Sequence, residues 1–440
     1  MRPATCGEFE KLLVVAVLAA RQRRRFTLGN NLHEPGVTAI AVGRHFRSQF
    51  ELRVGQHALQ FVQSPGIGQA FDLPANERGH DRQRVGVGPM KKVEDDIGVE
   101  DEAQHAADYN VRLFSARPGI VMPRILLAPM EGLADDVLRG VLTAIGGYDW
   151  GICEFIRVSG SVLPVKTYER ICPELLSGSS TAAGTPMRVQ LLGSDPHFMA
   201  ENARRLVTLN PAGIDLNFGC PAPTVNRHRG GAALLGEPEL LHAIASAVRA
   251  VVPVDMPFTA KMRLGIDDTG LAVDCAQALA AGGIDELIVH GRTKLDGYRP
   301  PARWMWIDRL RSAVAVPIIA NGEVWTVEDF VRCQQETGCA DIMLGRGAVA
   351  DPLLARRARG EELGGWAELA PWVATYWQGV RRKVVAEHAG GRLKQWLALL
   401  RRNYPEAEEL YQRLRPIMAA HEIDAALVAA GIPGELLLAA

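Results

Sequence analysis

Eight short apolar runs, each followed by a stretch with helical periodicity, constrain the fold of this chain more than any other feature of its sequence. The runs occupy residues 125–127, 151–153, 188–191, 214–217, 259–262, 287–290, 318–321 and 342–345. Strands that alternate with helices pair in parallel, because each helix carries the chain back to the start of the next strand. Eight such units over about 230 residues predict an α/β fold, a (β/α)8 TIM barrel.

The stretches between the runs carry their own helical signals. Residues 239–251 place an apolar stripe at helical spacing, which we expect to face the sheet. The stripe consists of Leu240, Leu241, Ile244, Val248 and Val251. Thr326 and Asp329 form a Thr-x-x-Asp pattern that predicts the start of another helix.

The strands stop after the eighth unit, and the tail from about residue 361 has only helical character. Trp372 and Tyr376 fall on one predicted helix, and Trp396 lies on the next. Between residues 371 and 415 there are nine Lys or Arg residues and four Glu residues, although the whole chain has a net charge of −1. This small helical domain is therefore locally basic, and such a surface is a candidate contact for nucleic acid.

We divide the chain into three parts: an extension over residues 1–121, a catalytic barrel over 122–360 and a helical domain over 361–440. The extension keeps no sustained helical or strand period. Two explanations are open, a poorly ordered extension or a choice of start site with translation beginning at or near Met122. We favour the second, because Met122 comes directly before the first clean strand.

Composition excludes several classes of protein. The seven cysteines show no CxxC pair and no zinc-like spacing, which suits a reducing cytoplasm better than a disulfide framework. The early apolar run from Leu12 to Ala20 is far short of the ~20 residues that cross a bilayer. Arginines follow this run, whereas a secretion signal carries its positive charge first. We expect a cytoplasmic monomer with no metal and no membrane segment.

In a TIM barrel the active site lies at the C-terminal ends of the strands, so polar residues there are the functional candidates. The first strand ends in a tight turn at Pro129, Met130 and Glu131, which either holds a planar ring or is an ordinary loop. Gln190, on the third strand, either offers a donor and an acceptor to a heterocycle or bonds within the barrel interior.

The fourth strand is followed by the most informative turn. Cys220 lies between Gly219 and Pro221, just past the strand end, and Asn217 precedes it. A thiol with a pKa of about 8.5 is protonated at neutral pH and can act as a general acid. A lone cysteine is more often a small buried side chain, and we assign the other six to that class. The motif around Cys220 makes it the catalytic candidate.

Cationic and imidazole side chains end the next two strands. Lys261 either faces an electron-rich carbonyl of a cofactor, forms a Schiff base, or is a charge-paired structural lysine. His290 is followed by Gly291 and Arg292, and these neighbours favour an anionic or ring ligand over a core histidine.

The seventh and eighth strands end in glycine-containing turns, at residues 321–323 and 345–348. The loops after these two strands form the usual phosphate site of such barrels, because glycine lets backbone N–H groups approach an oxyanion. Arg346 adds a positive charge. The two turns predict a phosphate-bearing cofactor or substrate.

Taken in order, these strand-end motifs resemble those of the dihydrouridine synthase family, from about Met122 to about Arg415. The matching stretches are residues 127–132, 189–191, 217–221, 261–265, 290–293, 321–323 and 345–348. Each stretch is weak evidence alone, and seven of them in the correct order make a specific resemblance. Residues 1–121 have no counterpart in it.

The resemblance implies FMN at the barrel mouth, with NADPH or NADH as the electron donor. The residues that it assigns to the cofactor are Pro129, Met130, Glu131, Gln190, Lys261, His290, Asn321, Gly322, Glu323, Gly345 and Arg346. It also implies that reduced flavin passes a hydride to C6 of a uracil in tRNA while Cys220 protonates C5.

Within the family, the chain is most similar to the C-type bacterial members, which modify uridine 16 in the D-loop of tRNA. Residues 154–158, 163–166, 170–175 and 392–397 carry this likeness. It implies tRNA contacts at Arg157, Asn217, Tyr298, Arg392, Lys394 and Arg415. Cations contact phosphates, and the target base must leave its stack to reach a buried ring. Phe218 departs from the family pattern, and it either reshapes the pocket or packs.

Two other functions are compatible with parts of the sequence. An FMN barrel that acts on a small molecule, such as dihydroorotate, would explain Lys261 and the phosphate loops, but it would not need a basic helical tail. A tRNA-binding protein without catalysis would explain the tail, and it predicts a colourless preparation.

Overall fold

The computed structural model describes residues 39–41, 50–55, 58–63 and 122–438. The first three ranges form a small antiparallel sheet of β1 (Ala39–Ala41), β2 (Phe50–Gly55) and β3 (Ala58–Gln63). The sequence predicted no sustained strand in residues 1–121, and strands this short do not produce a long period in a window of residues. The expectations about order and start site in the rest of this segment lie outside the described residues.

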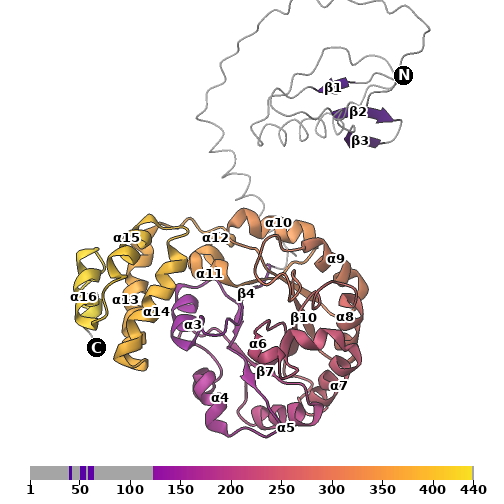
Figure 1. Cartoon of the computed structure of the whole chain (residues 1–440), viewed down its shortest axis with the longest axis horizontal. Coiled ribbons are helices and arrows are strands. Elements are labelled where there is room, and N and C mark those ends of the chain that lie inside the picture. Colours follow the sequence, from indigo (N-terminus) through magenta and orange to yellow (C-terminus); the bar gives the residue numbers. More distant parts are fainter. Residues whose placement is uncertain (1–38, 42–49, 56–57, 64–121, 439–440) are drawn as a thin grey trace, which may run out of the picture. The chain divides into compact units, whose positions relative to one another are not determined.

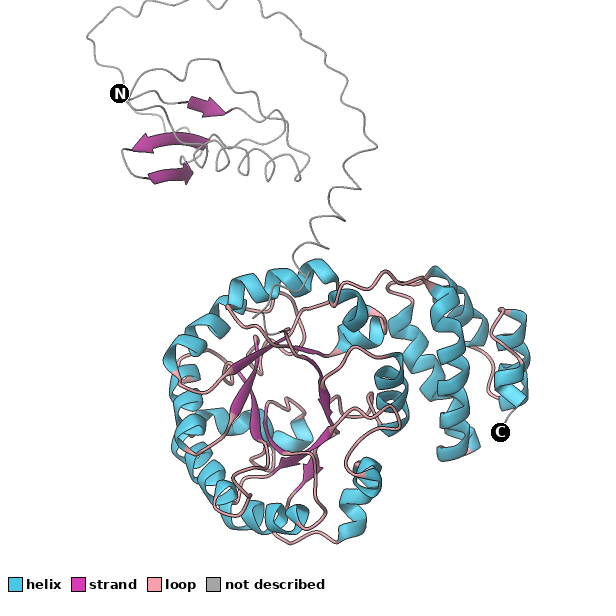
Figure 2. Cartoon of the chain, turned by 180° about the vertical axis from the view of Figure 1, so that it is seen from behind, coloured by secondary structure: helices cyan, strands magenta, loops and turns pink. Residues whose placement is uncertain are grey.

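The barrel is a closed ring of eight parallel strands (Figures 1 and 2). The strands are β4 (Ile125–Leu127), β5 (Trp150–Ile152), β7 (Met187–Leu192), β8 (Ile214–Phe218), β9 (Phe258–Arg263), β10 (Glu286–His290), β11 (Ile318–Asn321) and β12 (Ile342–Leu344). Pairing of β12 with β4 and of β5 with β7 closes the ring. All eight predicted strands are thereby confirmed. The two-residue strand β6 (Ile156–Arg157), which pairs with β7, was not predicted.

Alternate residues on each strand serve two different cores. Leu126 and Ile288 point into the ring, where they pack with Trp150, Ile152, Ile319 and Met343. Their neighbours Ile125 and Leu287 join the larger core under the surrounding helices. Both sides of each strand are buried, so the strands read as continuous apolar runs instead of alternating ones. Phe218 lies in the outer core, so it packs and does not line the pocket.

Helices surround the ring (Figure 2), and the labels in Figure 1 show that they follow one another in chain order. They are α3 (Asp136–Ile145), α4 (Val165–Ile171), α5 (Pro196–Val207), α6 (Pro223–Asn226), α7 (Pro238–Arg249), α8 (Ala272–Ala281), α9 (Trp304–Ala313), α10 (Val327–Thr337), α11 (Arg346–Ala350) and α12 (Leu354–Ala358), with short helices η1 (Pro173–Ser177) and η2 (Gly231–Gly236). The Thr326 side chain accepts the Asp329 backbone N–H at 3.1 Å, which confirms the predicted start of α10. The buried side of α7 includes Leu241, Ile244 and Val248, as the apolar stripe predicted.

The C-terminal helices pack beside the barrel, as Figure 1 shows. They are α13 (Trp366–Lys383), α14 (Ala386–Leu400), α15 (Pro405–Leu414), α16 (Ala420–Ala429) and α17 (Glu435–Leu438). The Trp396 indole N–H donates to the carbonyl of Val349 at 3.1 Å, and the Tyr404 hydroxyl donates to Asp351 at 2.6 Å. These bonds hold the helical part against α11, which begins directly at the end of β12. The boundary at residue 360 stays a prediction, because both parts lie in one compact unit.

Among the described helices, none combines the length and the apolar character that crossing a bilayer requires.

Candidate active site at the barrel mouth

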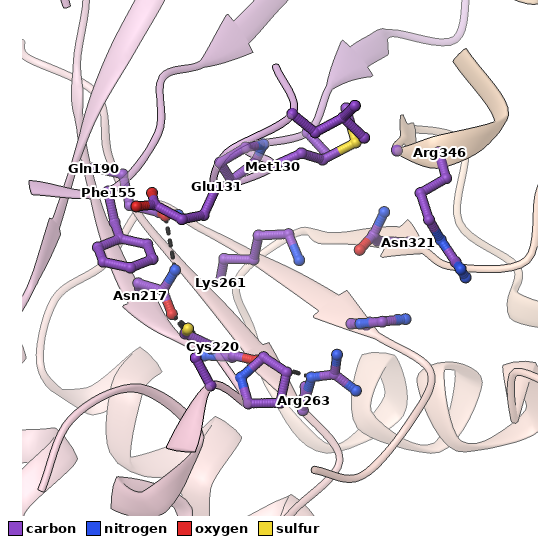
Figure 3. A pocket seen from close by; sticks show the side chains of 18 of the residues that line it. Met130, Glu131, Phe155, Gln190, Asn217, Cys220, Lys261, Arg263, Asn321 and Arg346 are labelled. Carbon is purple, nitrogen blue, oxygen red and sulfur yellow. Dashed lines mark hydrogen bonds between the residues drawn. The ribbon is translucent and has the colours of Figure 1, made fainter. Parts of the chain in front are cut away.

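A cavity of about 1010 Å³ opens at the C-terminal ends of the strands. Its lining includes all the residues that the sequence assigned to a cofactor, together with Cys220, Arg157, Asn217 and Tyr298. Strand register explains this convergence, because Asn217 pairs with Lys261, Arg263 with His290, and His290 with Asn321 on adjacent strands. Figure 3 shows Lys261 reaching into the cavity between Asn217 and Asn321.

A buried hydrogen-bond relay leads from β9 to the catalytic turn. Asp215 accepts the Thr259 hydroxyl at 2.6 Å and the Gln190 amide N–H at 2.7 Å. The Gln190 carbonyl oxygen accepts the Asn217 amide at 2.7 Å. Since a carboxylate only accepts, Asp215 fixes which way the amide of Gln190 faces, and Gln190 in turn fixes Asn217. The sequence analysis did not identify Asp215. Because Asp215 lies two residues before Asn217, the two side chains share one face of β8, and this spacing could have indicated it.

The relay ends at Cys220. Asn217 Oδ1 accepts the backbone N–H groups of Gly219 and Cys220, each at 2.9 Å. The Cys220 carbonyl accepts the Ala232 backbone N–H and the Asn226 amide, each at 3.0 Å. Burial raises the pKa of the Cys220 thiol, and the nearby carboxylate of Glu131 acts in the same direction. The thiol therefore lies at the cavity wall in its protonated form at neutral pH.

The other described cysteines are buried, as predicted, and only Cys220 is partly exposed. Cys6 lies outside the described residues. No group of three or more His, Cys, Asp or Glu side chains within the described ranges has the arrangement of a metal site.

Lys261 is the cation at the centre of the cavity. Burial lowers the pKa of its ammonium group to about 8, and the positive charge of Arg263 acts in the same direction. Within residues 122–438 the ammonium group makes no hydrogen bond or ion pair, and the buried carboxylate of Asp215 attracts it only through space. An ammonium group held in this way needs an electron-rich partner from a ligand.

Arg263 is a pocket residue that the sequence analysis did not propose. Its guanidinium donates to the carbonyl of Gly219 at 2.8 Å, of Thr293 at 2.9 Å and of Gly297 at 2.8 Å. Arg263 thereby ties the turn before Cys220 to the loop after β10. Two-residue alternation from Lys261 was the signal that could have found it.

His290 is held as a neutral ring. Burial lowers the pKa of His290 well below its usual range, and the charges of Arg263 and Lys261 act in the same direction. Arg292 Nη1 lies 3.2 Å from His290 Nε2, and because guanidinium only donates, Nε2 is the acceptor. Arg292 also forms an ion pair with Glu323. Gly322 has φ +113°, and a Cβ there would lie 2.7 Å from the His290 ring, so only glycine fits.

The cavity has a cationic lining, and Arg292 and Arg346 bring part of this charge to the side of β11 and β12. Its lining carries Arg157, Arg170, Lys261, Arg263, Arg292 and Arg346 against the carboxylates of Glu131 and Glu323. Burial and the neighbouring Arg346 lower the pKa of Arg292 to about 10. Arg346 stacks between two rings, 4.5 Å from the Tyr298 centroid and 5.1 Å from the Trp325 centroid. Clustered cations with depressed pKa values indicate a site for an anion.

The turn after β4 forms the neighbouring wall, because β4 pairs with β12. Pro129, Met130 and Glu131 line the cavity, and Figure 3 shows Glu131 near Gln190 and Phe155. Burial raises the pKa of the Glu131 carboxyl, and the nearby Glu154 adds to the effect. Glu154 accepts the Gly132 backbone N–H at 2.6 Å, which fixes the turn.

Three of the six residues predicted to contact tRNA lie away from this cavity. Arg392 donates to the carbonyl of Gly132 at 2.6 Å and to Asp135 at 2.6 Å, so it ties α14 to the barrel. Lys394 donates to the carbonyls of Ile417 at 2.6 Å and of Arg415 at 3.3 Å. The Arg415 side chain is exposed. Contacts of these three with RNA stay predictions.

The fold and the site together define a TIM-barrel protein whose mouth holds clustered cations beside a protonated thiol. Comparison with known proteins narrows this class. A family model described as dihydrouridine synthase (Dus) matches residues 126–404. The tRNA-dihydrouridine(16) synthase of Ralstonia nicotianae is 54% identical over 307 residues, covering 69% of this chain and 94% of that protein. The tRNA-dihydrouridine(16) synthase of Aquipseudomonas alcaligenes is 55% identical over 307 residues, covering 68% of this chain and 98% of that protein.

The chain belongs to the dihydrouridine synthase family. The expected fold and the expected flavin-dependent oxidoreductase activity are thereby confirmed. A more distant relative, the tRNA-dihydrouridine(16) synthase of Shewanella oneidensis, is 46% identical over 301 residues, covering 68% of this chain and 96% of that protein. FMN as the particular flavin, NADPH as the reductant and the roles of single residues stay predictions.

Proposed function

We propose that this protein reduces uridine 16 in the D-loop of tRNA to 5,6-dihydrouridine, with FMN as the cofactor and NADPH as the reductant. One observation carries the proposal: a protonated thiol, Cys220, and a buried ammonium group, Lys261, face one cavity of about 1010 Å³. The family assignment and the shared name of the curated relatives support the reaction and the position.

The residues present fit FMN. Lys261 offers a positive charge to an electron-rich ring carbonyl, and Gln190 keeps one amide hydrogen free beyond its bond to Asp215. Asn321 is held by its bond to the Met343 carbonyl at 2.8 Å and lines the cavity toward the phosphate side. Gly345 leaves its backbone open, since a Cβ there would meet nothing closer than 3.8 Å. Arg346 and the cations beside it would hold the phosphate.

A reduced flavin held by these residues would supply a hydride to C6 of the uracil ring. Cys220 supplies the proton to C5, so one hydride and one proton add across the C5–C6 double bond and a thiolate remains. The raised pKa keeps this thiol protonated before the reaction. The relay through Asn217 holds Cys220 in place during the transfer. His290, neutral and facing the cavity, adds a hydrogen-bond partner without a further charge.

The uridine must leave the RNA stack to enter the cavity. Arg157, Asn217 and Tyr298 line the cavity where the base would enter. Arg392, Lys394 and Arg415 belong to the helical part, which we infer lies along the tRNA backbone. We further infer that the protein acts as a cytoplasmic monomer.

The test is to map dihydrouridine in tRNA from a strain that lacks this gene. Loss of dihydrouridine at position 16 alone, restored by the gene, is the expected result. Unchanged tRNA would contradict the reaction, and loss at another position would contradict the site. A small-molecule flavoenzyme predicts unchanged tRNA with a yellow protein, and a non-catalytic tRNA-binding protein predicts a colourless one.

A further inference from the structure

A second cavity, of about 420 Å³, lies beside the first. Its lining comes from three segments: residues 157–160 at the end of β6, residues 192–195 at the end of β7, and residues 225–230 at the end of α6. Arg157 and Val225 line both cavities, so the two spaces are adjacent. A cavity of this size is within the range of small-ligand sites, which is about 300–1,000 Å³.

The three segments are packed tightly against one another. A Cβ at Gly193 would lie 2.6 Å from the sulfur of Met199 and 3.0 Å from the Val158 carbonyl. At Gly230 it would lie 3.1 Å from Leu192. Glycines at these two points let the segments meet, so the cavity wall is part of the packed structure and not a gap between separate segments.

The cavity has a strongly basic lining. Arg157, Arg227, His228 and Arg229 face one carboxylate, that of Asp195. The Asp195 carboxylate already accepts the backbone N–H of Phe198 at 3.1 Å as the N-cap of α5. Arg229 forms an ion pair with Glu237 at 2.5 Å. No ion pair or side-chain hydrogen bond to another described residue holds Arg157, Arg227 or His228.

We propose that this second cavity binds a phosphate of the RNA chain next to the uridine that enters the main cavity. The inference rests on the proposed function. A nucleotide inserted beside Cys220 keeps its 5′ and 3′ phosphates outside the ring site, and Arg157, which lines both cavities, connects that site with the second cavity. Arg227 and His228 are the residues that would meet the adjoining phosphate. Phosphate contacts of this kind set the register of the RNA without reading its sequence.

The same charges would also suit a phosphate of the nicotinamide dinucleotide, so the experiment has two arms. The first measures the Kd of the flavin-loaded protein for unmodified tRNA at several salt concentrations. The second measures the Kd for NADPH from the rate of flavin reduction without tRNA. The variant combines Arg227→Ala with His228→Ala. The matched control is Arg205→Ala. Arg205 is an exposed arginine in the last turn of α5, the helix whose N-cap residue, Asp195, lines the cavity.

We expect the double variant to bind tRNA about threefold to tenfold more weakly. The slope of log affinity against log salt concentration should fall by about the amount that one phosphate contact contributes. Its Kd for NADPH should equal that of the wild type, and the control should match the wild type in both arms. Unchanged tRNA affinity, or a loss in the NADPH arm alone, would overturn the proposal. Wild-type protein that neither binds tRNA nor forms dihydrouridine would overturn the proposed function instead. Both variant positions are exposed, and an unchanged melting temperature with bound flavin shows that the fold is intact.

Discussion

The side-chain oxygen of Asn217 accepts the backbone N–H of Cys220 at 2.9 Å, so the position of the thiol depends on the orientation of one amide. That amide is fixed by Gln190, which is fixed by the carboxylate of Asp215. The catalytic turn is therefore positioned from the barrel interior by side chains on two adjacent strands.

Asp215 should make stability fall as the pH rises through weakly acidic values. Burial raises the pKa of this carboxyl from 3.8 to about 6 in the folded protein. At a pH between these two pKa values, Asp215 is protonated in the folded protein and ionised in the unfolded chain. Ionisation of Asp215 in the folded protein at higher pH therefore costs about 3 kcal/mol of stability. Asp215→Asn removes this titration. Thermal unfolding from pH 4 to pH 7 should therefore show the wild type losing stability relative to the variant. If the melting temperatures of the wild type and the variant changed in parallel with pH, the pKa of Asp215 would be the same in the folded and the unfolded protein.

Gly231→Ala should reduce dihydrouridine formation without loss of flavin. Gly231 has φ +61°, and its Cβ would lie 2.7 Å from the Cys220 carbonyl oxygen, so the catalytic turn must shift. Gly178→Ala is the matched control, because φ is +72° there and a Cβ meets nothing within 4 Å. Both variants carry a similar backbone strain of about 1 kcal/mol. Equal activity losses in the two would show that the close approach to Cys220 is not what matters.

The affinity for FMN should fall as the pH rises above about 8. The pKa of Lys261 in the free protein is lowered to about 8, and only the protonated form offers a charge-assisted hydrogen bond to the ring. Such a bond contributes about 1.5–3 kcal/mol, so Lys261→Met should weaken binding about tenfold to a hundredfold at pH 7. Fluorescence titrations at pH 7 and pH 9.5 measure both effects. A pH dependence that persists in the variant would remove Lys261 from the cofactor site.

Arg346→Ala should weaken FMN binding about tenfold or more while leaving riboflavin binding nearly unchanged. The two ligands differ only in the phosphate, so their ratio isolates the contribution of this guanidinium. Paired titrations of apoprotein with FMN and riboflavin provide the measurement. An equal loss for both ligands would mean that Arg346 supports the pocket through its stacking on Tyr298 and Trp325 and does not bind the phosphate.

The sequence predicted the barrel well because a strand buried on both sides is a continuous apolar run. Strand β6 was missed because two residues carry no period, and Arg157 lies on it. Arg263 and Arg292 were not proposed as pocket residues, since a fully buried guanidinium is unusual. The carbonyl partners of Arg263 also come from loops distant in sequence. The likeness to the C-type members suggested Arg392 and Lys394 as RNA contacts, and these contacts stay predictions. The sequence could not reveal that both side chains donate to backbone carbonyls distant in the chain.

Conversion of Cys220 to alanine tests the central claim most directly. The measurement is mass-spectrometric mapping of dihydrouridine in tRNA from a strain lacking the gene, after treatment with purified wild-type or Cys220→Ala protein of equal flavin content. The account predicts that the variant keeps its yellow colour and its flavin reduction by NADPH but forms no dihydrouridine at position 16. Full modification by the variant would contradict the role of this thiol as the proton donor.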